Sequence, residues 1–318
     1  MLNGGYVMKL INCVPCCFAF LIGIQALGDT LDLGIIMVGG DGTSEMDPWG
    51  LSVATGALVA PNVYGGGASS GPAFHKTDGS ATSANLPYVD GVFVPKGLTQ
   101  IDSLGHTFAF PSTGGRQFDA LRNAACVYDN DLGSPQMVQL QLSDEPNVPR
   151  AGIGMHPNAG VTFDLQDLRQ AGYVISTVEG VGGLNFDAIA LHVGSVEAWV
   201  LLDGVQQYHQ QFIGAGAGPY SAPFTIPISG ANRFLTLACT DSNGANSSDH
   251  AGFADLRLNV SLCIGDFNQD GSINLPDVSI LLSNYGCTGA CIGDVDFDSH
   301  VDLNDIAILL NLYGDLCP

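Results

Sequence analysis

The chain has 318 residues, in which 31 Asp and Glu outnumber 9 Lys and Arg and give a formal net charge of −22. Binding to nucleic acid or to an anionic membrane surface needs clustered cations, so this charge balance excludes both classes of partner. Because 46% of the residues are hydrophobic and only 13% are charged, the composition also excludes a disordered protein and supplies enough apolar surface for two folded domains.

The first predicted element is an apolar stretch at residues 10–28, which follows Lys9 and ends in the small-residue pattern Ala26-Leu27-Gly28. One cation, an apolar run interrupted by Pro15 and a small-residue exit are typical of a secretory signal peptide. We therefore predict that residues 1–28 are a signal peptide. The mature protein is then secreted, in the extracellular space or at the cell surface, with no membrane span. An uncleaved membrane anchor is the alternative interpretation.

The next region, residues 29–262, is predicted to be β-structure. The 42 glycines of the chain, and the lack of long Lys/Glu-rich stretches, favour short strands and turns over a helical bundle. Alternating or β-branched runs predict strands at residues 89–95, 106–111, 138–142, 196–204, 224–228, 233–239 and 256–262. One helix is predicted at 163–172. This pattern is typical of a β-sandwich of the jelly-roll kind.

Four segments of this region resemble the NPCBM family: GMHPNAGVTFDL (154–165), AWVLLDGVQQYHQQF (198–212), RFLTLACTD (233–241) and DHAGFADLRL (249–258). The resemblance is clearest over residues 150–262. It implies a galactose-binding-like β-sandwich of the kind found beside glycoside hydrolases. Where the family often has Trp in a DH-x-x-W segment, this chain has Phe253. The β-segments before residue 150 are either an elaboration of the sandwich or a separate small domain.

A carbohydrate site in such a sandwich combines an aromatic platform for the pyranose ring with carboxylates, amides or imidazoles for the hydroxyl groups. The candidates are His156, Trp199, Tyr208, Asp241, Asp249 and His250. Structural explanations exist beside this one, because Trp199 lies in an apolar strand and the histidines and aspartates can close loops or turns. A glycan or polysaccharide is the predicted partner of the body.

No catalytic constellation is predicted. Residues Gly67–Gly71 match G-x-S-x-G, but Pro72 follows them in a Gly/Ser-rich stretch where a hydrolase needs a strand, a sharp turn and a helix. The few Glu residues form no convincing glycosidase pair, and the His residues lack metalloprotease spacing. We therefore predict a non-catalytic carbohydrate-binding protein. The alternatives are a structural cell-surface or matrix protein without a small ligand, and an accessory or true glycoside hydrolase.

The C-terminal tail, residues 263–318, contains nine Asp and no Lys, Arg or Glu. Within it Cys263-Ile264-Gly265-Asp266 returns after 28 residues as Cys291-Ile292-Gly293-Asp294. An acidic loop follows each of these sequences, and an apolar pattern at i, i+3, i+4 and i+7 follows each loop. That spacing predicts one helix per repeat. The apolar positions are Val278, Leu281, Leu282 and Tyr285 in the first repeat, and Ile306, Leu309, Leu310 and Tyr313 in the second.

The loops at 266–277 and 294–305 have the pattern of calcium sites. Calcium takes six to eight oxygen ligands, and alternating positions of a twelve-residue loop turn inward as the loop curls. The first loop offers Asp266, Asn268, Asp270, the Ser272 backbone, Asn274 and Asp277. The second offers Asp294, Asp296, Asp298, the His300 backbone, Asp302 and Asp305. We predict two calcium ions, and a merely solvated acidic tail is the alternative.

Two such loops, each with Asp at position 12 and followed by one helix, resemble a type I dockerin repeat over residues 263–317. The resemblance implies a small all-α, EF-hand-like module that folds around calcium and serves as an anchor or association module. The implied partner is a cohesin-like domain or a cell-surface protein. The predicted protein is thus mainly β, with a sandwich at 29–262 and this module at 263–318.

Six cysteines follow the predicted signal peptide, an even number that predicts disulfides in an exported chain. If a pseudo-twofold axis relates the two repeats, the start of each loop lies near the end of the other repeat's helix. This symmetry predicts Cys263–Cys317 and Cys287–Cys291, one of three possible connectivities. A zinc site made of the four thiolates is the alternative. Cys126 and Cys239 form either a third bridge or two buried free thiols.

Overall fold

The computed structural model describes residues 29–43, 49–61, 63, 74–77, 86–111, 113, 120–130, 134–142, 148–185, 194–214, 219–244, 249–268, 270–288, 291–296, 298 and 300–317. The predicted signal peptide at 1–28 and the Gly67–Gly71 string lie outside these residues. Among the described residues, no helix is long and apolar enough to cross a membrane.

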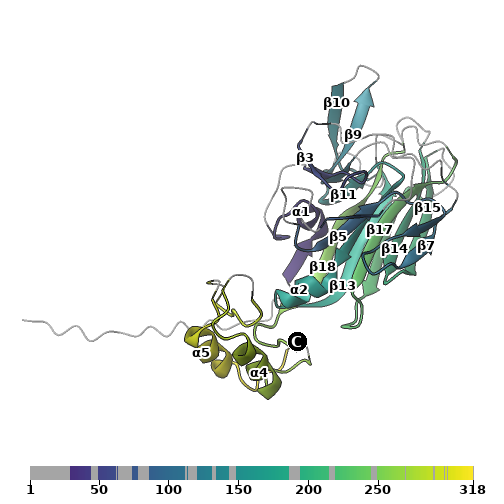
Figure 1. Ribbon diagram of the computed structural model, residues 1–318. Coiled ribbons are helices and arrows are strands. Elements are labelled where there is room, and N and C mark those ends of the chain that lie inside the picture. Colours follow the sequence, from purple (N-terminus) through teal and green to yellow (C-terminus); the bar gives the residue numbers. More distant parts are fainter. Residues whose placement is uncertain are drawn as a thin grey trace, which may run out of the picture.

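The body is mainly β and consists of two antiparallel sheets that pack face to face (Figure 1). The first sheet contains, in spatial order, β16 (Ser221–Pro227), β13 (Tyr173–Leu184), β18 (Ala251–Leu262), β11 (Gly152–Met155), β8 (Leu121–Asn123), β2 (Gly50–Leu51) and β3 (Leu58–Val59). The second contains β15 (Val205–Ile213), β14 (Ser195–Leu202), β17 (Phe234–Asp241), β12 (Ala159–Asp164), β5 (Val89–Phe93) and β4 (His75–Lys76).

One continuous apolar core lies between the two sheets. Alternate residues of the strands point inward, so that Val178 and Leu258 of the first sheet meet Val161 and Leu237 of the second, all four fully buried. Phe253, at the position where the NPCBM family often has Trp, is one of these core residues. The burial of this apolar surface is the main source of the body's stability.

The N-terminal segments of the body belong to the same sandwich. Strand β1 (Asp29–Asp32) pairs with the second half of β18, and β5 pairs with β12 between residues 89–93 and 160–163. Strands β2 and β8 extend the first sheet beyond β11. These N-terminal strands are therefore hydrogen-bonded members of the two sheets that also contain residues 150–262.

Two short helices lie on the part of the body that the structure describes. In α1 (Leu33–Met37) and α2 (Leu165–Gln170), the preceding Asp side chain accepts a hydrogen bond from a backbone N–H of the first turn. Helix α2 ends before Gly172, whose φ of +89° suits glycine. The predicted helix at 163–172 is thus shorter than expected, because its first residues end β12. With five residues, α1 is too short to show a helical period, and the sequence did not predict it.

A second, smaller apolar cluster covers the outer face of the second sheet. The hairpin of β6 (Leu98–Gln100) and β7 (Thr107–Ala109) lies over this face, where Phe93, Ile101, Phe110, Trp199, Leu201 and Ala238 are buried together. Trp199 contacts Phe108 and Phe110 edge to face, with ring centroids 5.6 and 5.9 Å apart. A separate hairpin, β9 (Ala125–Asn130) and β10 (Ser134–Gln139), extends from the body near β8.

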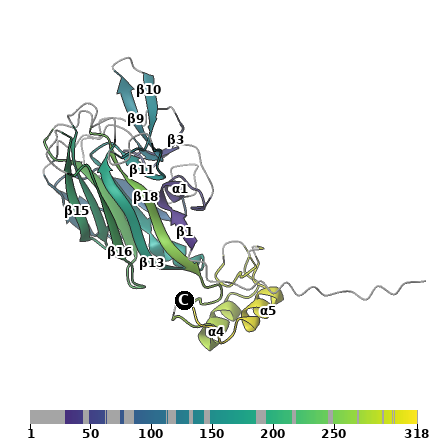
Figure 2. The same ribbon diagram turned by 180° about the vertical axis from the view of Figure 1, so that it is seen from behind.

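The tail lies at the end of the sandwich that carries α2, and β18 leads directly into it (Figures 1 and 2). It contains α4 (Leu275–Ser283) and α5 (Leu303–Asn311) around a small core of Ile273, Leu281, Val295, Val301 and Leu309. Only Leu281 and Leu309 of the two predicted apolar stripes are fully buried. Leu282, Tyr285, Leu310 and Tyr313 are at least half exposed. The apolar stripes therefore predicted the helices but only some of the residues of the tail's core.

Candidate functional site

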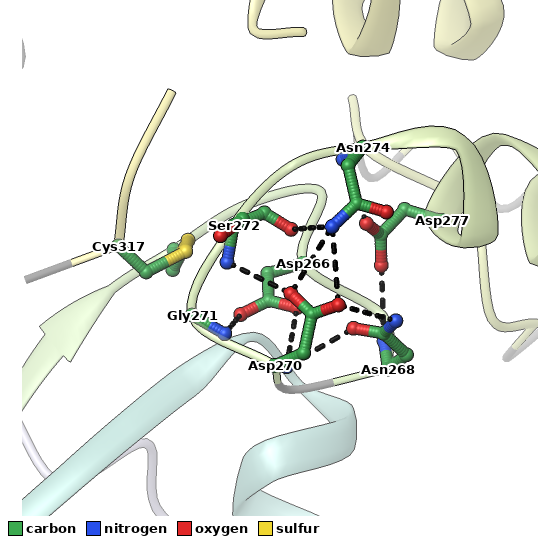
Figure 3. Close-up of a disulfide and its surroundings, with 9 residues drawn as sticks. Asp266, Asn268, Asp270, Gly271, Ser272, Asn274, Asp277 and Cys317 are labelled. Carbon is green, nitrogen blue, oxygen red and sulfur yellow. Dashed lines mark hydrogen bonds between the residues drawn. A yellow bond between two sulfur atoms is a disulfide. The ribbon is translucent and has the colours of Figure 1, made fainter. Parts of the chain in front are cut away.

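The first acidic loop of the tail encloses a set of oxygen-bearing side chains (Figure 3). The carboxylate of Asp266 accepts hydrogen bonds from the N–H groups of Asp270 and Gly271, at 3.1 and 2.9 Å. The buried Asp277 carboxylate accepts from the N–H groups of Asn268 and Asn274 with its two oxygens. These bonds curl the loop so that its predicted ligand residues face a common centre. Gly271, with φ +85°, makes the sharp turn.

The second loop repeats this arrangement. Asp305, also fully buried, accepts from the N–H of Val295 at 2.7 Å and from that of Asp302 at 2.7 Å. Carboxylate oxygens of Asp294, Asp296 and Asp305 lie within 4.8 Å of one another. Asp298 accepts from the N–H of His300 at 2.8 Å. The 28-residue period of the sequence thus corresponds to two similarly folded loops.

The donor set of both loops fits a hard cation. Asn274 Oδ1 is buried without a hydrogen-bond partner among the described residues, although a buried amide oxygen normally has one. Burial and the neighbouring Asp277 and Asp270 carboxylates raise the pKa of Asp266. Desolvation and three adjacent carboxylates likewise raise the pKa of Asp296. A divalent cation would offset this crowding of like charges and take up the unpaired oxygen.

Two disulfides close the tail. They join Cys263 to Cys317 and Cys287 to Cys291, with Cα atoms 5.6 and 6.2 Å apart, in the pairing that the pseudo-twofold symmetry predicts. These thiolates are therefore not the ligands of a zinc site. Cys126 and Cys239 of the body are both buried as thiols, and no third disulfide joins them.

Four of the six predicted ligand residues of the body meet at the end of the sandwich far from the tail. His156 follows β11, Asp241 ends β17, and Asp249 and His250 precede β18. The imidazoles of His156 and His250 stand edge to face, with ring centroids 5.2 Å apart. The register of β11 with β18 brings these strand ends together although they are distant in sequence. We name this group of four residues the loop-end cluster.

Asn158, which the sequence analysis did not single out, joins the ends of two neighbouring strands of the second sheet at the loop-end cluster, because it precedes β12 and bonds to the last residue of β17. Its Nδ2 donates to Asp241 Oδ2 at 2.9 Å, and its Oδ1 accepts from the N–H of Asp241, also at 2.9 Å. Asp241 also accepts from the N–H of Gly244 at 2.9 Å. The only local signal was a turn-forming Pro-Asn pair, which does not identify a partner 83 residues away.

Asp249 is the most strongly perturbed member of the loop-end cluster. Its Oδ1 accepts from the N–H of Ser195 at 2.7 Å, whereas Oδ2 is buried with no hydrogen-bond partner among the described residues. Burial, with a further contribution from the negative charge of Asp241, raises the pKa of Asp249 to about 7. At neutral pH this carboxyl group therefore exists as a mixture of its charged and neutral forms.

The loop-end cluster is a buried layer. His156, Asp241, Asp249 and His250 are each less than 5% exposed, so their side chains lie beneath the surface. The chain continues from this layer into segments 186–193 and 245–248, which are outside the described residues. In the part of the chain that the structure describes, the cluster can position neighbouring segments, and no open face of it is presented to a ligand.

Trp199 and Tyr208, the predicted aromatic platforms, lie elsewhere. Trp199 is 6% exposed, its Nε1 donates to Thr240 Oγ1 at 3.0 Å, and its ring is stacked on His209 at 3.7 Å. Tyr208 is half-buried, and burial raises the pKa of its phenol to about 12. Its ring packs on Phe224 and its hydroxyl donates to the carbonyl of Ala222. Both rings are thus packing residues, and they do not join the loop-end cluster.

A comparison with known families finds a match in the central part of the body. The NPCBM/NEW2 domain matches residues 121–259, from β8 to near the end of β18. This match confirms the NPCBM resemblance, whereas the dockerin resemblance of the tail stays a prediction. No curated protein matches this sequence.

Several solved carbohydrate-binding modules are similar to parts of this chain. CBM51 from Clostridium perfringens GH95, in complex with methyl-galactose, is 24% identical over 37% of this chain and 77% of its own, with a TM-score of 0.32. The tandem CBM51 modules of Sp3GH98, the family 98 glycoside hydrolase from Streptococcus pneumoniae SP3-BS71, are 15% identical, with coverages of 45% and 42% and a TM-score of 0.34. A CBM36 module in complex with calcium and xylotriose is 13% identical, with coverages of 44% and 98% and a TM-score of 0.22.

Proposed function

We propose that the body is a secreted, non-catalytic carbohydrate-binding module. The observation that carries this proposal is the NPCBM/NEW2 match over residues 121–259, which covers most of the antiparallel sandwich. Members of the family that the body resembles are sandwiches found beside glycoside hydrolases. The resemblance therefore implies that the body binds a glycan or polysaccharide. The fold alone does not decide the function, since unrelated functions share it, so the proposal rests on the family match.

The loop-end cluster supports this proposal as a positioning element. Asn158 and Asp241 join the second sheet's strand ends through two reciprocal hydrogen bonds, and Asp249 holds the N–H of Ser195. Rigid, hydrogen-bonded strand ends are a suitable base for ligand-binding loops, because ordering the loops beforehand lowers the entropic cost of binding. We therefore expect the cluster to act on glycan affinity by fixing the segments that flank it.

A glycan-array screen of the full chain in calcium buffer tests the proposal. Saturable binding to one class of glycan is the expected result. Silence across the array would favour the structural surface or matrix protein instead. Turnover of any substrate in a panel of polysaccharides would favour the glycoside hydrolase.

We further propose that the tail binds two calcium ions as a dockerin-like association or anchoring module. The predicted ligands in the first loop are Asp266, Asn268, Asp270, Ser272, Asn274 and Asp277, and those in the second are Asp294, Asp296, Asp298, His300, Asp302 and Asp305. When bound, calcium would cross-link the oxygen atoms of each loop. The unpartnered Asn274 Oδ1 supports this proposal. The resemblance alone suggests a cohesin-like domain or a cell-surface protein as the partner.

Calorimetric titration of calcium into the full chain tests the tail. We expect two ions per chain in the wild type and one in Asp270→Ala, because Asp270 supplies its carboxylate to the first loop only. Asp315→Asn, an exposed acidic residue outside both loops, is the matched control and should keep two. An unchanged stoichiometry in Asp270→Ala would contradict the assignment of the first loop.

A further inference from the structure

A polar cavity lies at the end of the second sheet opposite to the loop-end cluster. Its volume is about 270 Å³. It opens where β12 ends and α2 begins. Because β12 has six residues, the cavity is about 20 Å from the loop-end cluster along the strand. Its polar lining includes Lys76, Asp90, Ser103, Asp164, Asp167 and Arg233.

Charged groups of both signs are held in fixed positions around this cavity. Arg233 donates to Asp164 Oδ2 from Nε at 3.1 Å and from Nη2 at 2.8 Å, and its guanidinium lies 5.0 Å from the centre of the Phe234 ring. The other oxygen of Asp164 accepts from the N–H of Gln166 at 2.9 Å, at the start of α2. Arg233 and Asp164 are therefore held on several sides before any ligand arrives.

Two further carboxylates face the cavity without a cation of their own. Asp90, only 6% exposed, accepts from the N–H of Ser103 at 2.7 Å. Within the described part of the chain, neither Asp90 nor Asp167 makes an ion pair. Burial, followed by the negative charge of Asp164, raises the pKa of Asp167, and burial also raises that of Asp90. Among the described residues Ser103 alone donates to Asp90 and no group donates to the Asp167 carboxylate, so a ligand could supply further donors.

The lining suits hydroxyl groups better than other ligand chemistries. A hydroxyl donates to one group and accepts from another, and the lining contains both carboxylate acceptors and the Arg233 and Lys76 donors. An anion is disfavoured, because three Asp face one Arg and one Lys. The carboxylates do not converge as metal ligands do, since in the described chain such groupings occur only in the tail. An apolar ligand would leave buried charges unpaired.

We propose that this cavity, at Asp90, Asp167 and Arg233, binds one neutral or amino sugar residue of a glycan. The inference rests on the proposed carbohydrate-binding function and assigns it a site. Asp90 and Asp167 accept from ring hydroxyls, and the free edge of the Arg233 guanidinium together with Lys76 donates to them. The net negative charge of the lining excludes uronic acids. None of these residues belongs to the sequence-predicted ligand set.

Nuclear magnetic resonance titration of the full chain with D-galactose, D-xylose, N-acetyl-D-glucosamine and D-glucuronic acid tests the assignment. We expect saturable shifts of the backbone amides of Ser103, Asp167 and Arg233 with at least one of the first three sugars. The amides of Ser195 and His250, at the opposite end, should stay unchanged. D-glucuronic acid should produce no saturable shift.

A matched pair of variants on α2 completes the test. Asp167→Ala should weaken the binding of the sugar that shifts the wild type by about tenfold, the loss of one charge-assisted hydrogen bond. Gln166→Ala, on the same helix but outside the cavity, should bind as the wild type does. If Asp167→Ala reduces the thermal stability, Lys76→Ala replaces it, since Lys76 is exposed on the short strand β4.

The two proposals fail in different ways. Shifts confined to Ser195 and His250, or an unchanged affinity in Asp167→Ala and Lys76→Ala, would overturn the cavity as the site while leaving carbohydrate binding intact. Saturable binding of D-glucuronic acid in the cavity would overturn the charge argument. Silence with all sugars and across the glycan array would remove both the proposed function and its site.

Discussion

The body and the tail are stabilised in different ways. The body has a large apolar core between two sheets, with residues such as Leu237, Phe253 and Leu258 fully buried. In the tail only a handful of apolar residues, among them Leu281 and Leu309, are buried around two short helices. A region of this size buries little apolar surface to offset its conformational entropy, so we expect the two disulfides, together with metal binding by the two acidic loops, to contribute much of its stability.

This difference means that solvent conditions act on the two regions separately. Metal ions and redox state should determine whether the tail is folded, whereas core packing should determine whether the body is folded. The four predictions below test this separation, from the largest expected effect to the smallest.

Removal of calcium should have the largest effect, and it should be confined to the tail. Without a cation, the crowded carboxylates around Asp266 and Asp296 repel one another, and the folded loops lose the free energy of metal binding. We expect chelation to cause loss of dispersed amide signals from residues 263–317 while those of the sandwich persist. Heteronuclear spectra before and after chelation measure this. Equal loss of signals in both regions would contradict the separation.

Truncation of a core residue should destabilise the body alone. Phe253→Ala removes a fully buried ring that packs on Phe224, and we expect a loss of about 3–5 kcal/mol in the free energy of unfolding of the body. Denaturant titration monitored by circular dichroism gives this value. Calcium titration of the same variant should still show two ions. Val205→Ala, at an exposed apolar position of β15, is the control.

The two disulfides should contribute unequally to the tail. The bridge Cys263–Cys317 closes a loop of 54 residues and Cys287–Cys291 a loop of 4. The loop-entropy relation gives about 4 kcal/mol for the first and about 2 kcal/mol for the second. We expect paired Cys→Ser replacements to lower the tail's unfolding temperature in that order. A larger effect of the short bridge would show that the bridges do not stabilise the tail mainly by lowering the entropy of the unfolded chain.

The pH dependence of the body should show the smallest effect. The pKa of Asp249 lies at about 7 in the folded state and at 3.8 for the free group, so the folded protein binds more protons between these values. The stability that this group contributes is therefore present at low pH and is lost as the pH rises toward about 7. Asp241 strengthens this shift and His250 opposes it.

The variant Asp249→Asn isolates this contribution. It keeps the shape of the side chain and removes the charge, so the body should be more stable than the wild type by about 1–2 kcal/mol at pH 8, and the difference should vanish near pH 4. Thermal unfolding across this range provides the comparison. A wild type that gains stability from pH 4 to pH 7 relative to the variant would contradict the burial of Asp249.

The strands that could be predicted from the sequence are those with apolar alternation. The predicted runs at 196–204, 233–239 and 256–262 fall on β14, β17 and β18. Strand β15 was missed because it lies at a sheet edge and exposes most of its polar residues. Strand β13 was missed because glycines fill its second half. A Cβ atom at Gly183 would lie only 2.7 Å from the Cβ of Ser221, so close packing there requires glycine.

The tail loops, the loop-end cluster and the cavity also differ in how far they could be predicted from the sequence. The inward-facing arrangement of the oxygen-bearing residues in the tail loops could be predicted because all of them lie within twelve consecutive positions, where local spacing determines which side chains face inward; that they bind calcium stays a prediction. The loop-end cluster depends on strand register. Its four residues were predicted as candidates, but the sequence did not show that they lie together in a buried layer. The cavity at Asp90, Asp164 and Arg233 was not foreseen, because three separate strands bring these residues together. No pattern within a short stretch of the sequence indicates that these residues lie close together.

The continuity of β18 with the tail has a mechanical consequence. Force applied to the tail enters the body at Cys263, because β18 continues directly into the tail (Figure 2). It then runs along a strand of twelve residues, which has a length of about 40 Å. This strand lies inside its sheet, where β13 pairs with one edge and β1 and β11 pair with the other. A pull along the strand axis loads all of these hydrogen bonds in parallel, so we expect β18 to leave the body only when they shear together.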